Sequence, residues 1–234
     1  MTIIENNIRS VQERISAAAL KAGKKPEDIM LVAVTKTQSA EIVNQALKAG
    51  IKDFGENKVQ EAINKFPLLS KTYKGFHFIG HLQTNKVKAL LKLNPVLIHS
   101  VDSFHLAMAI SKALEGLDKI QPILLQVNTS GEDSKSGIEP ERLVELAKEI
   151  TKLPNLSVKG LMTIGRLSSN PEDCRQDFKL LTHLSQELIR KKIPKLDMKW
   201  ISMGMTNDFE IAIEEGANLV RIGSAIFGER HYQR

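Results

Sequence analysis

The stretch "ISMGMTNDFEIAIEEGANLVRIGSAIFGER", residues 201–230, decides the fold because it holds most of two strand-and-helix units. Its apolar runs predict strands over 199–203 and 218–222, with a helix over 206–214 between them and a short helix from Ser224. Two strands joined through a helix run parallel, because parallel neighbours need a long crossover connection. The stretch therefore predicts an α/β protein built on a parallel sheet.

The same alternation of strands and helices fills the rest of the chain. An N-terminal helix is predicted over 4–22, where apolar residues recur at helical spacing up to Gly23. Eight strands alternating with helices in 234 residues predict a closed (β/α)8 TIM barrel with this extra N-terminal helix. The other strands are expected at 29–35, 51–54, 75–79, 96–100, 121–127 and 157–162, and the other helices at 39–49, 57–66, 84–92, 103–115, 139–150 and 172–191.

An open, doubly wound sheet is the competing architecture. It would require a glycine-rich GxGxxG turn after an early strand, and the TKTQ segment at 35–38 is nothing like one. No Ser/Pro-rich linker or low-complexity segment divides the chain. We therefore expect residues 1–234 to form one barrel domain.

The composition limits the cellular compartments and the kinds of partner that we expect for this protein. Cys174 is the single cysteine, the N-terminus carries no secretory signal, and no apolar run approaches the roughly 18 residues of a membrane span. We expect a cytoplasmic monomer that does not contact a membrane. The net charge of +6 could attract nucleic acid, but the lysines are scattered and only 5% of residues are aromatic. We expect this charge to favour anionic metabolites instead.

Metal and thiol chemistry find little support in the sequence. There is no HExxH or CxxC pattern. His77 and His81 are four residues apart, but they straddle a predicted strand end and would not share a face. Cys174 has no general-base partner nearby in the sequence, so an inert thiol is expected. We expect no metal site.

Small and hydroxyl residues follow the last two predicted strands, where barrels often bind phosphate. Ser202 and Gly204 follow the seventh strand, and Gly223 and Ser224 follow the eighth. Glycine lets backbone N–H groups approach an anion, and a serine hydroxyl adds a donor. These residues predict a phosphate site, although Gly223 and Ser224 could equally be a strand-to-helix turn with a serine cap.

A lysine, Lys36, ends the first predicted strand within "IMLVAVTKTQ" at 29–38. It could be a surface lysine whose stem leaves the core for solvent. It could also be an amine with a pKa lowered by desolvation, which makes it nucleophilic towards carbonyls. A nucleophilic lysine and a phosphate site on one barrel face would suit a phosphorylated aldehyde. Pyridoxal 5′-phosphate (PLP) is the leading candidate, and a sugar phosphate is the other.

Arg221, which ends the eighth strand, bears on this choice. Many PLP enzymes place an acidic residue at the pyridine nitrogen to keep it protonated. A guanidinium there would leave the nitrogen unprotonated, because it only donates and stays charged. The ring would then stabilise a carbanion less well. A phosphate contact or a salt bridge at the barrel rim are the alternatives for Arg221.

Several ordered motifs together resemble the YggS/PROSC family of PLP homeostasis proteins, whose fold is similar to the barrel domain of alanine racemase. The resemblance covers essentially the whole chain. The motifs that carry it are "LVAVTK" (31–36), "FGENKVQE" (54–61), "HFIGHLQTNK" (77–86), "HSVDS" (99–103), "GLMTIG" (160–165), "SMGMTNDFEIAI" (202–213) and "VRIGSAIFGER" (220–230).

The resemblance implies roles for particular residues. It implies that Lys36 holds PLP as a Schiff base and that Arg221 lies near the ring or the phosphate. It implies that Asn57 and Met162 line the ring. Thr206 stands where family members often carry serine and keeps the hydroxyl. The residues implied around the phosphate are Ser202, Gly204, Gly223 and Ser224.

The resemblance also implies a role in vitamin B6 and amino-acid homeostasis, with apo-PLP enzymes and small amines or amino acids as partners. A racemase of the alanine racemase type is the alternative, and it needs a second base opposite the lysine. Alanine racemase takes that base, a tyrosine, from a second domain, and none is expected after the eighth unit of this chain. Tyr73 and Tyr232 are the only tyrosines, and neither is placed to serve. We therefore expect a PLP-binding protein with no catalytic residue. A cofactor-free aldolase acting on a sugar phosphate is a further alternative.

Overall fold

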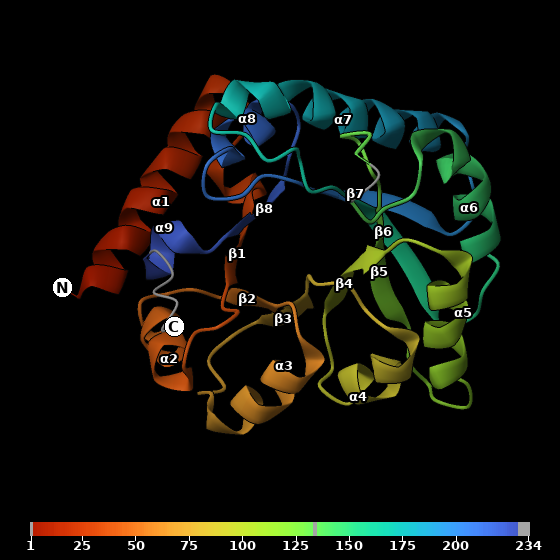
Figure 1. Ribbon diagram of the computed structural model, residues 1–234, viewed down its shortest axis with the longest axis horizontal. Coiled ribbons are helices and arrows are strands. Elements are labelled where there is room, and N and C mark those ends of the chain that lie inside the picture. The colour runs from red at the N-terminus through yellow and green to blue at the C-terminus, as the bar shows by residue number, and fades with distance from the viewer. Residues whose placement is uncertain (1, 133–134, 229–234) are drawn as a thin grey trace.

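Eight parallel strands close into a barrel in the computed structural model of the protein, which describes residues 2–132 and 135–228 (Figure 1). Each strand pairs with the next along the chain, and the eighth pairs with the first. The strands are β1 (Met30–Val34), β2 (Asp53–Glu56), β3 (Gly75–Phe78), β4 (Leu97–Val101), β5 (Gln121–Gln126), β6 (Leu156–Met162), β7 (Leu196–Ser202) and β8 (Leu219–Ile222). The predicted (β/α)8 barrel is therefore confirmed.

Helices surround the barrel and follow each strand in turn (Figure 1). Short 3-10 turns precede three of them, so these helices, each predicted as a single segment, begin with a tighter turn. The α-helices are α1 (Ile3–Lys21), α2 (Ala40–Lys48), α3 (Val59–Lys65), α4 (Val87–Leu91), α5 (Phe104–Ala113), α6 (Leu143–Ile150), α7 (Arg175–Arg190), α8 (Phe209–Glu214) and α9 (Ser224–Phe227). Among the described residues, no helix is both long and apolar enough to cross a membrane.

The predicted N-terminal helix is confirmed as α1, which lies on the outside of the barrel beside α8 and α9 (Figure 1). It begins with a capping box, in which Thr2 and Glu5 satisfy each other's backbone N–H groups. It ends before Gly23, whose φ of 68° suits glycine. Asn7 donates from Nδ2 to the carbonyl oxygen of Ile226 at 2.9 Å, which ties α1 to α9 at the carboxyl-terminal edge of β8.

Strand β2 starts two residues later than the predicted range of 51–54. Ile51 is apolar and buried, yet it belongs to the end of α2, since its N–H donates to the carbonyl oxygen of Ala46 at 3.1 Å. At the other end the strand extends through Glu56, which is fully buried. A strand is predicted to end at a charged residue because the charge is expected to face solvent. Glu56 instead pairs with Lys65 inside the protein.

The barrel interior is packed with an apolar cluster and a set of polar side chains. The apolar cluster consists of Val32, Leu97, Leu124, Met162 and Leu219, one residue from each of five strands. A larger apolar cluster lies between the strands and the surrounding helices. The polar interior side chains come from β2, β3, β4, β7 and β8, and they lead towards the carboxyl-terminal edge, where barrels place their chemistry.

Candidate functional site

A cavity of about 210 Å³ opens where β1, β7 and β8 end. Lys36 borders it from the β1 side, and Arg221, Gly223 and Ser224 border it from β8 and the start of α9. The loop after β7, residues 205–208, and residues 166–168 after β6 complete the lining. A second cavity of about 170 Å³ shares Lys36, Gly223 and Ser224. The structure thus brings together four of the residues predicted from the sequence.

A tight turn after β1 presents Lys36. The N–H of Thr35 still donates to the strand neighbour at the Gly55 carbonyl, and Gln38 donates to the carbonyl of Thr35 at 3.1 Å, which closes the turn. Thr37 takes a φ of 67°, a conformation that costs a β-branched residue energy. Lys36, at the first corner of this turn, is half-buried. The backbone is therefore held in an unfavourable conformation directly beside the predicted cofactor lysine.

A buried ion pair supports this turn from behind. Lys65 Nζ donates to Glu56 Oε1 at 2.5 Å and to the carbonyl oxygen of Thr35 at 2.9 Å. The Thr35 hydroxyl donates to the same carboxylate oxygen at 2.7 Å. Burial raises the pKa of Glu56, while hydrogen bonds from Lys65 and Thr35 act in the opposite direction. The pair was not predicted, because a lysine in α3 and a glutamate in β2 both read as surface residues.

Arg221 is almost fully buried at the floor of the cavity. Its Nη1 donates to Ser202 Oγ at 2.6 Å, and its Nη2 donates to the carbonyl oxygen of Thr163 at 2.8 Å. Burial lowers the pKa of Arg221 to about 10, while the carboxylate of Asp208 acts in the opposite direction. The guanidinium therefore remains charged at neutral pH.

Asp208 also lines the cavity, and this acidic residue was not predicted from the sequence. Its Oδ1 accepts a hydrogen bond from the Met205 N–H at 2.6 Å, and burial raises the pKa of its carboxyl group. Thr206, which lies in the same loop, accepts from the Ala225 N–H at 3.3 Å and so links this loop to α9. The signal available was position alone, because the loop follows the predicted seventh strand.

The other predicted site residues do not line the cavity at Lys36. Ser202 is fully buried, and it contacts the cavity through Arg221, from which it accepts a hydrogen bond. Met162 lies in the apolar cluster of the barrel interior, and Asn57 follows β2 with a buried Oδ1 that has no hydrogen-bond partner. Gly204 has a φ of 91°, and a Cβ there would lie 2.6 Å from Ala212 Cβ, so a glycine is needed for α8 to pack.

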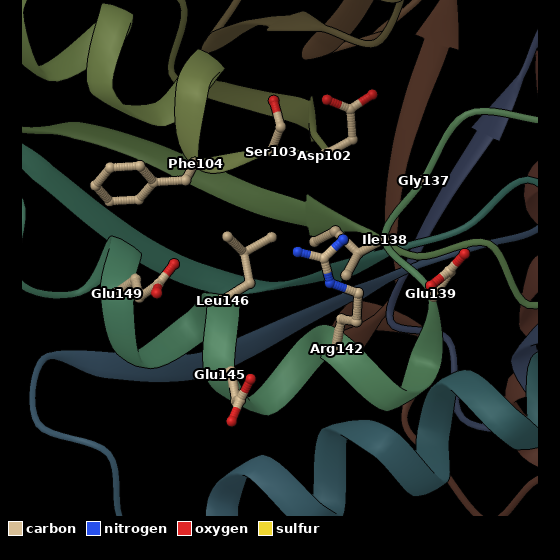
Figure 2. A pocket seen from close by; sticks show the side chains of 10 residues that line it. All are labelled: Asp102, Ser103, Phe104, Gly137, Ile138, Glu139, Arg142, Glu145, Leu146 and Glu149. Carbon is tan, nitrogen blue, oxygen red and sulfur yellow. The ribbon is translucent and has the colours of Figure 1, made fainter.

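A separate cavity of about 310 Å³ lies between the end of β4 and α6 (Figure 2). Figure 2 shows Arg142 projecting towards the side where Asp102 and Ser103 lie, while Glu145 points away. It shares no residue with the cavity at Lys36 and holds no lysine. Within the described part of the chain, no group of three His, Cys, Asp or Glu side chains is placed to hold a metal ion.

Cys174 is buried, and its surroundings predict a thiol that reacts slowly. Burial raises the pKa of the Cys174 thiol to about 11, with Asp208 acting in the same direction. The thiolate is the reactive form. We expect the folded protein at pH 8 to react with Ellman's reagent at least about 100-fold more slowly than the protein in guanidinium chloride. Equal rates in the two solvents would contradict the buried placement.

The fold and the site define a barrel of the alanine racemase N-terminal type, with a lysine after the first strand and a cavity shared with the loops after the last two. The sequence profile described as "Alanine racemase, N-terminal domain" matches residues 3–231. A solved alanine racemase from Clostridium difficile 630 superposes with a TM-score of 0.71 at 16% identity, covering 98% of this chain and 58% of that one. At this identity the likeness concerns the fold alone.

Closer relatives carry another description. A protein from Aquifex aeolicus is 45% identical over 95% of this chain and 96% of its own length, and one from Escherichia coli is 38% identical over 100% of both. Both are named pyridoxal phosphate homeostasis protein. The solved structure of PipY from Synechococcus elongatus PCC7942, with PLP bound, has a TM-score of 0.83 at 30% identity and covers 96% of this chain and 100% of that one. The chain therefore belongs to the family of pyridoxal phosphate homeostasis proteins, and the predicted resemblance is confirmed.

Proposed function

We propose that this protein binds PLP as a Schiff base on Lys36 and serves in PLP and amino-acid homeostasis. The observation that carries the proposal is the cavity in which Lys36, Arg221, Gly223 and Ser224 meet. Membership of the pyridoxal phosphate homeostasis family and the likeness to PLP-bound PipY support it. When bound, PLP supplies an electron-withdrawing ring and an aldehyde carbon that amines attack.

The residues around the cavity fit this cofactor. Lys36 offers the primary amine that an aldehyde needs. Gly223 and Ser224 offer backbone and hydroxyl donors beside it, and Arg221 adds a buried positive charge that suits an anionic ligand. Because Arg221 only donates hydrogen bonds, a ring nitrogen that met it would accept rather than carry a proton. This donor set favours holding the cofactor over making it a strong electron sink.

We infer that the protein holds and exchanges PLP without sustained turnover. Tyr73 packs against the rings of Phe54 and Phe66, with centroids 5.0 and 6.3 Å away, and it does not line the cavity. Tyr232, the other tyrosine, lies outside the described residues. A racemase remains the alternative, supported by the fold alone. Sustained racemisation of D- or L-amino acids by purified protein, lost on Lys36→Ala, would establish it.

Reduction with borohydride followed by peptide mapping tests the proposal directly. We expect a pyridoxyl label on the peptide that contains Lys36, and a 400–430 nm band before reduction. Lys36→Ala should lose both, while the exposed lysine variant Lys48→Ala should keep both. A label on another lysine, or none, would overturn the proposal. Absence of the visible band after purification and PLP addition would instead favour a cofactor-free aldolase.

The proposed partners follow from the same chemistry. Small amines and amino acids can displace a lysine from an aldehyde, so we expect cycloserine to change the visible spectrum of the loaded protein. Apo-PLP enzymes are the proposed recipients of the released cofactor. We also propose that the protein is a cytoplasmic monomer, which size-exclusion chromatography with light scattering and cell fractionation would test.

A further inference from the structure

A chain of hydrogen-bonded side chains crosses the barrel interior from the cavity to the opposite, amino-terminal side. Arg221 Nη1 lies 2.6 Å from Ser202 Oγ, which lies 3.1 Å from His99 Nδ1. His99 Nε2 lies 2.9 Å from His77 Nδ1, and His77 Nε2 lies 3.3 Å from Asp53 Oδ1. The five residues come from β8, β7, β4, β3 and β2. Two imidazoles thus connect a cation that lines the cavity to a carboxylate at the start of β2.

Arg221 fixes the direction of this chain, because a guanidinium only donates hydrogen bonds. Ser202 accepts from Arg221 and has its own hydroxyl hydrogen left to donate to His99 Nδ1. A neutral imidazole that accepts at Nδ1 carries its hydrogen at Nε2, so His99 donates to His77 Nδ1. His77 likewise donates from Nε2 to Asp53. Every donor in this chain of hydrogen bonds then has one acceptor, and no second cation is needed inside the barrel.

The reverse direction is disfavoured inside the barrel. It would need His99 to donate to Ser202 and His77 to carry two hydrogens, which places a second buried cation near Arg221. His99 is fully buried and His77 is 2% exposed. Burial, then His77, then the charge of Arg221 hold the pKa of His99 well below its usual value. The neutral, Nε2-protonated form of His99 is therefore the one that this environment supports.

A glycine makes room for the far end of the chain. A Cβ at Gly75 would lie 2.4 Å from Asp53 Oδ1 and 3.3 Å from His77 Nε2. Any side chain at this position would therefore displace the carboxylate from the imidazole. The Asp53–His77 contact depends on the absence of a side chain at the first residue of β3.

We propose that His99 and His77 are positioning residues for the cofactor site. They direct the Ser202 hydroxyl hydrogen away from Arg221, so that Ser202 and the Thr163 carbonyl can both accept from the guanidinium and hold it at the cavity. A charged side chain that is fixed before the ligand arrives loses less freedom on binding. The inference rests on the proposed function, since Arg221 contributes to PLP binding only if the cavity at Lys36 is the PLP site.

Nitrogen NMR of the PLP-free protein tests the hydrogen-bond direction without any cofactor. In the ¹⁵N-labelled protein at pH 7, we expect His99 to be neutral with its hydrogen at Nε2, and His77 to carry a hydrogen at Nε2 that it donates to Asp53. An Nδ1-protonated or doubly protonated His99 would overturn the inference. This outcome is separate from the borohydride experiment, which tests only whether Lys36 binds PLP.

Three variants test the effect on the cofactor site, measured by PLP titration and the visible spectrum. His99→Phe removes both ring nitrogens, and we expect about tenfold weaker PLP binding with a shifted visible band. His99→Gln keeps one acceptor and one donor, and it should stay within about threefold of the parent protein. His183→Phe, at an exposed position of α7, is the matched control and should bind PLP normally. Equal affinities for the Phe and Gln variants at position 99 would overturn the positioning role. If His99→Phe does not fold, the NMR measurement on the unsubstituted protein decides.

Discussion

Replacing Lys65 with methionine is expected to lower the free energy of unfolding by about 3–5 kcal/mol at pH 7, because it leaves a buried carboxylate without its cation. Glu56 is fully buried, and Lys65 is its only charged hydrogen-bond partner among the described residues. The other carboxylate oxygen, Oε2, already lacks a hydrogen-bond partner. Methionine fills a similar volume, so the loss reports on charge more than on packing.

The pH dependence separates this explanation from a simple packing defect. Burial raises the pKa of Glu56 in the folded state above its unfolded value. The stability that Glu56 contributes is therefore greatest below its unfolded pKa and is lost as the pH rises through the raised folded value. Without Lys65 the folded pKa rises further. We expect the deficit of Lys65→Met to shrink as the pH is lowered from 7 to 5, because protonation of Glu56 removes its unpaired charge.

Urea unfolding followed by circular dichroism at pH 7 and pH 5 measures both effects. Lys48→Met, at an exposed position of α2, is the matched control and should change stability by less than about 0.5 kcal/mol. A deficit that is the same at both pH values would contradict the buried-charge explanation. We also expect weaker PLP binding by Lys65→Met, because Lys65 holds the Thr35 carbonyl next to Lys36.

Replacing Gly160 with alanine is expected to cost at least about 3 kcal/mol of stability, from a steric clash added to backbone strain. Gly160 has a φ of 143°, and a Cβ there would lie 1.8 Å from the carbonyl oxygen of Trp200 on the neighbouring strand. The pairing of β6 with β7 shifts register just before this position. A side chain would force the two strands apart, and the opposing atom is backbone that cannot rotate away.

Gly116→Ala is a control for the strain alone. Gly116 has a φ of 77°, but nothing lies within 4 Å of the added Cβ, so we expect a cost of about 1–2 kcal/mol. Urea unfolding of both variants gives the comparison. Similar losses of stability in the two variants would show that the clash with the Trp200 carbonyl adds nothing to the cost of alanine at position 160. Gly160 lies where β6 pairs with β7, and these strands end next to Thr163 and at Ser202, which both contact Arg221. PLP affinity should therefore fall with Gly160→Ala and stay unchanged with Gly116→Ala.

Local patterns were sufficient to predict the barrel and part of its site. Each strand and helix buries an apolar face whose period is written in consecutive residues, and eight alternating units leave few ways to bury all of them. The position of Lys36 at the end of β1, and of Gly223 and Ser224 after β8, follows from the same pattern. The interpretation of His77 and His81 as residues on different faces is confirmed, because His77 is buried in β3 while the side chain of His81 is 63% exposed.

The boundaries and the polar interior were not predictable in this way. Ile51 reads as a strand residue because it is apolar, and only the hydrogen bond to Ala46 shows that it ends α2. Glu56 and Lys65 read as solvent-facing charges, since neither position carries a local signal of burial. Their pairing depends on how α3 packs against β2 and not on the residues near each of them.

The sequence by itself determined the order of the eight units, the helix that precedes them and the edge at which Lys36 lies, because these depend on residues close together in the chain. Only the tertiary structure decided which polar groups meet inside the barrel. Arg221, Ser202, His99 and His77 touch because β3, β4, β7 and β8 curve into a closed barrel with a defined stagger. Within this set of contacts, His99 and Ser202 lie 103 positions apart in the sequence, and a pattern among neighbouring residues cannot predict their contact.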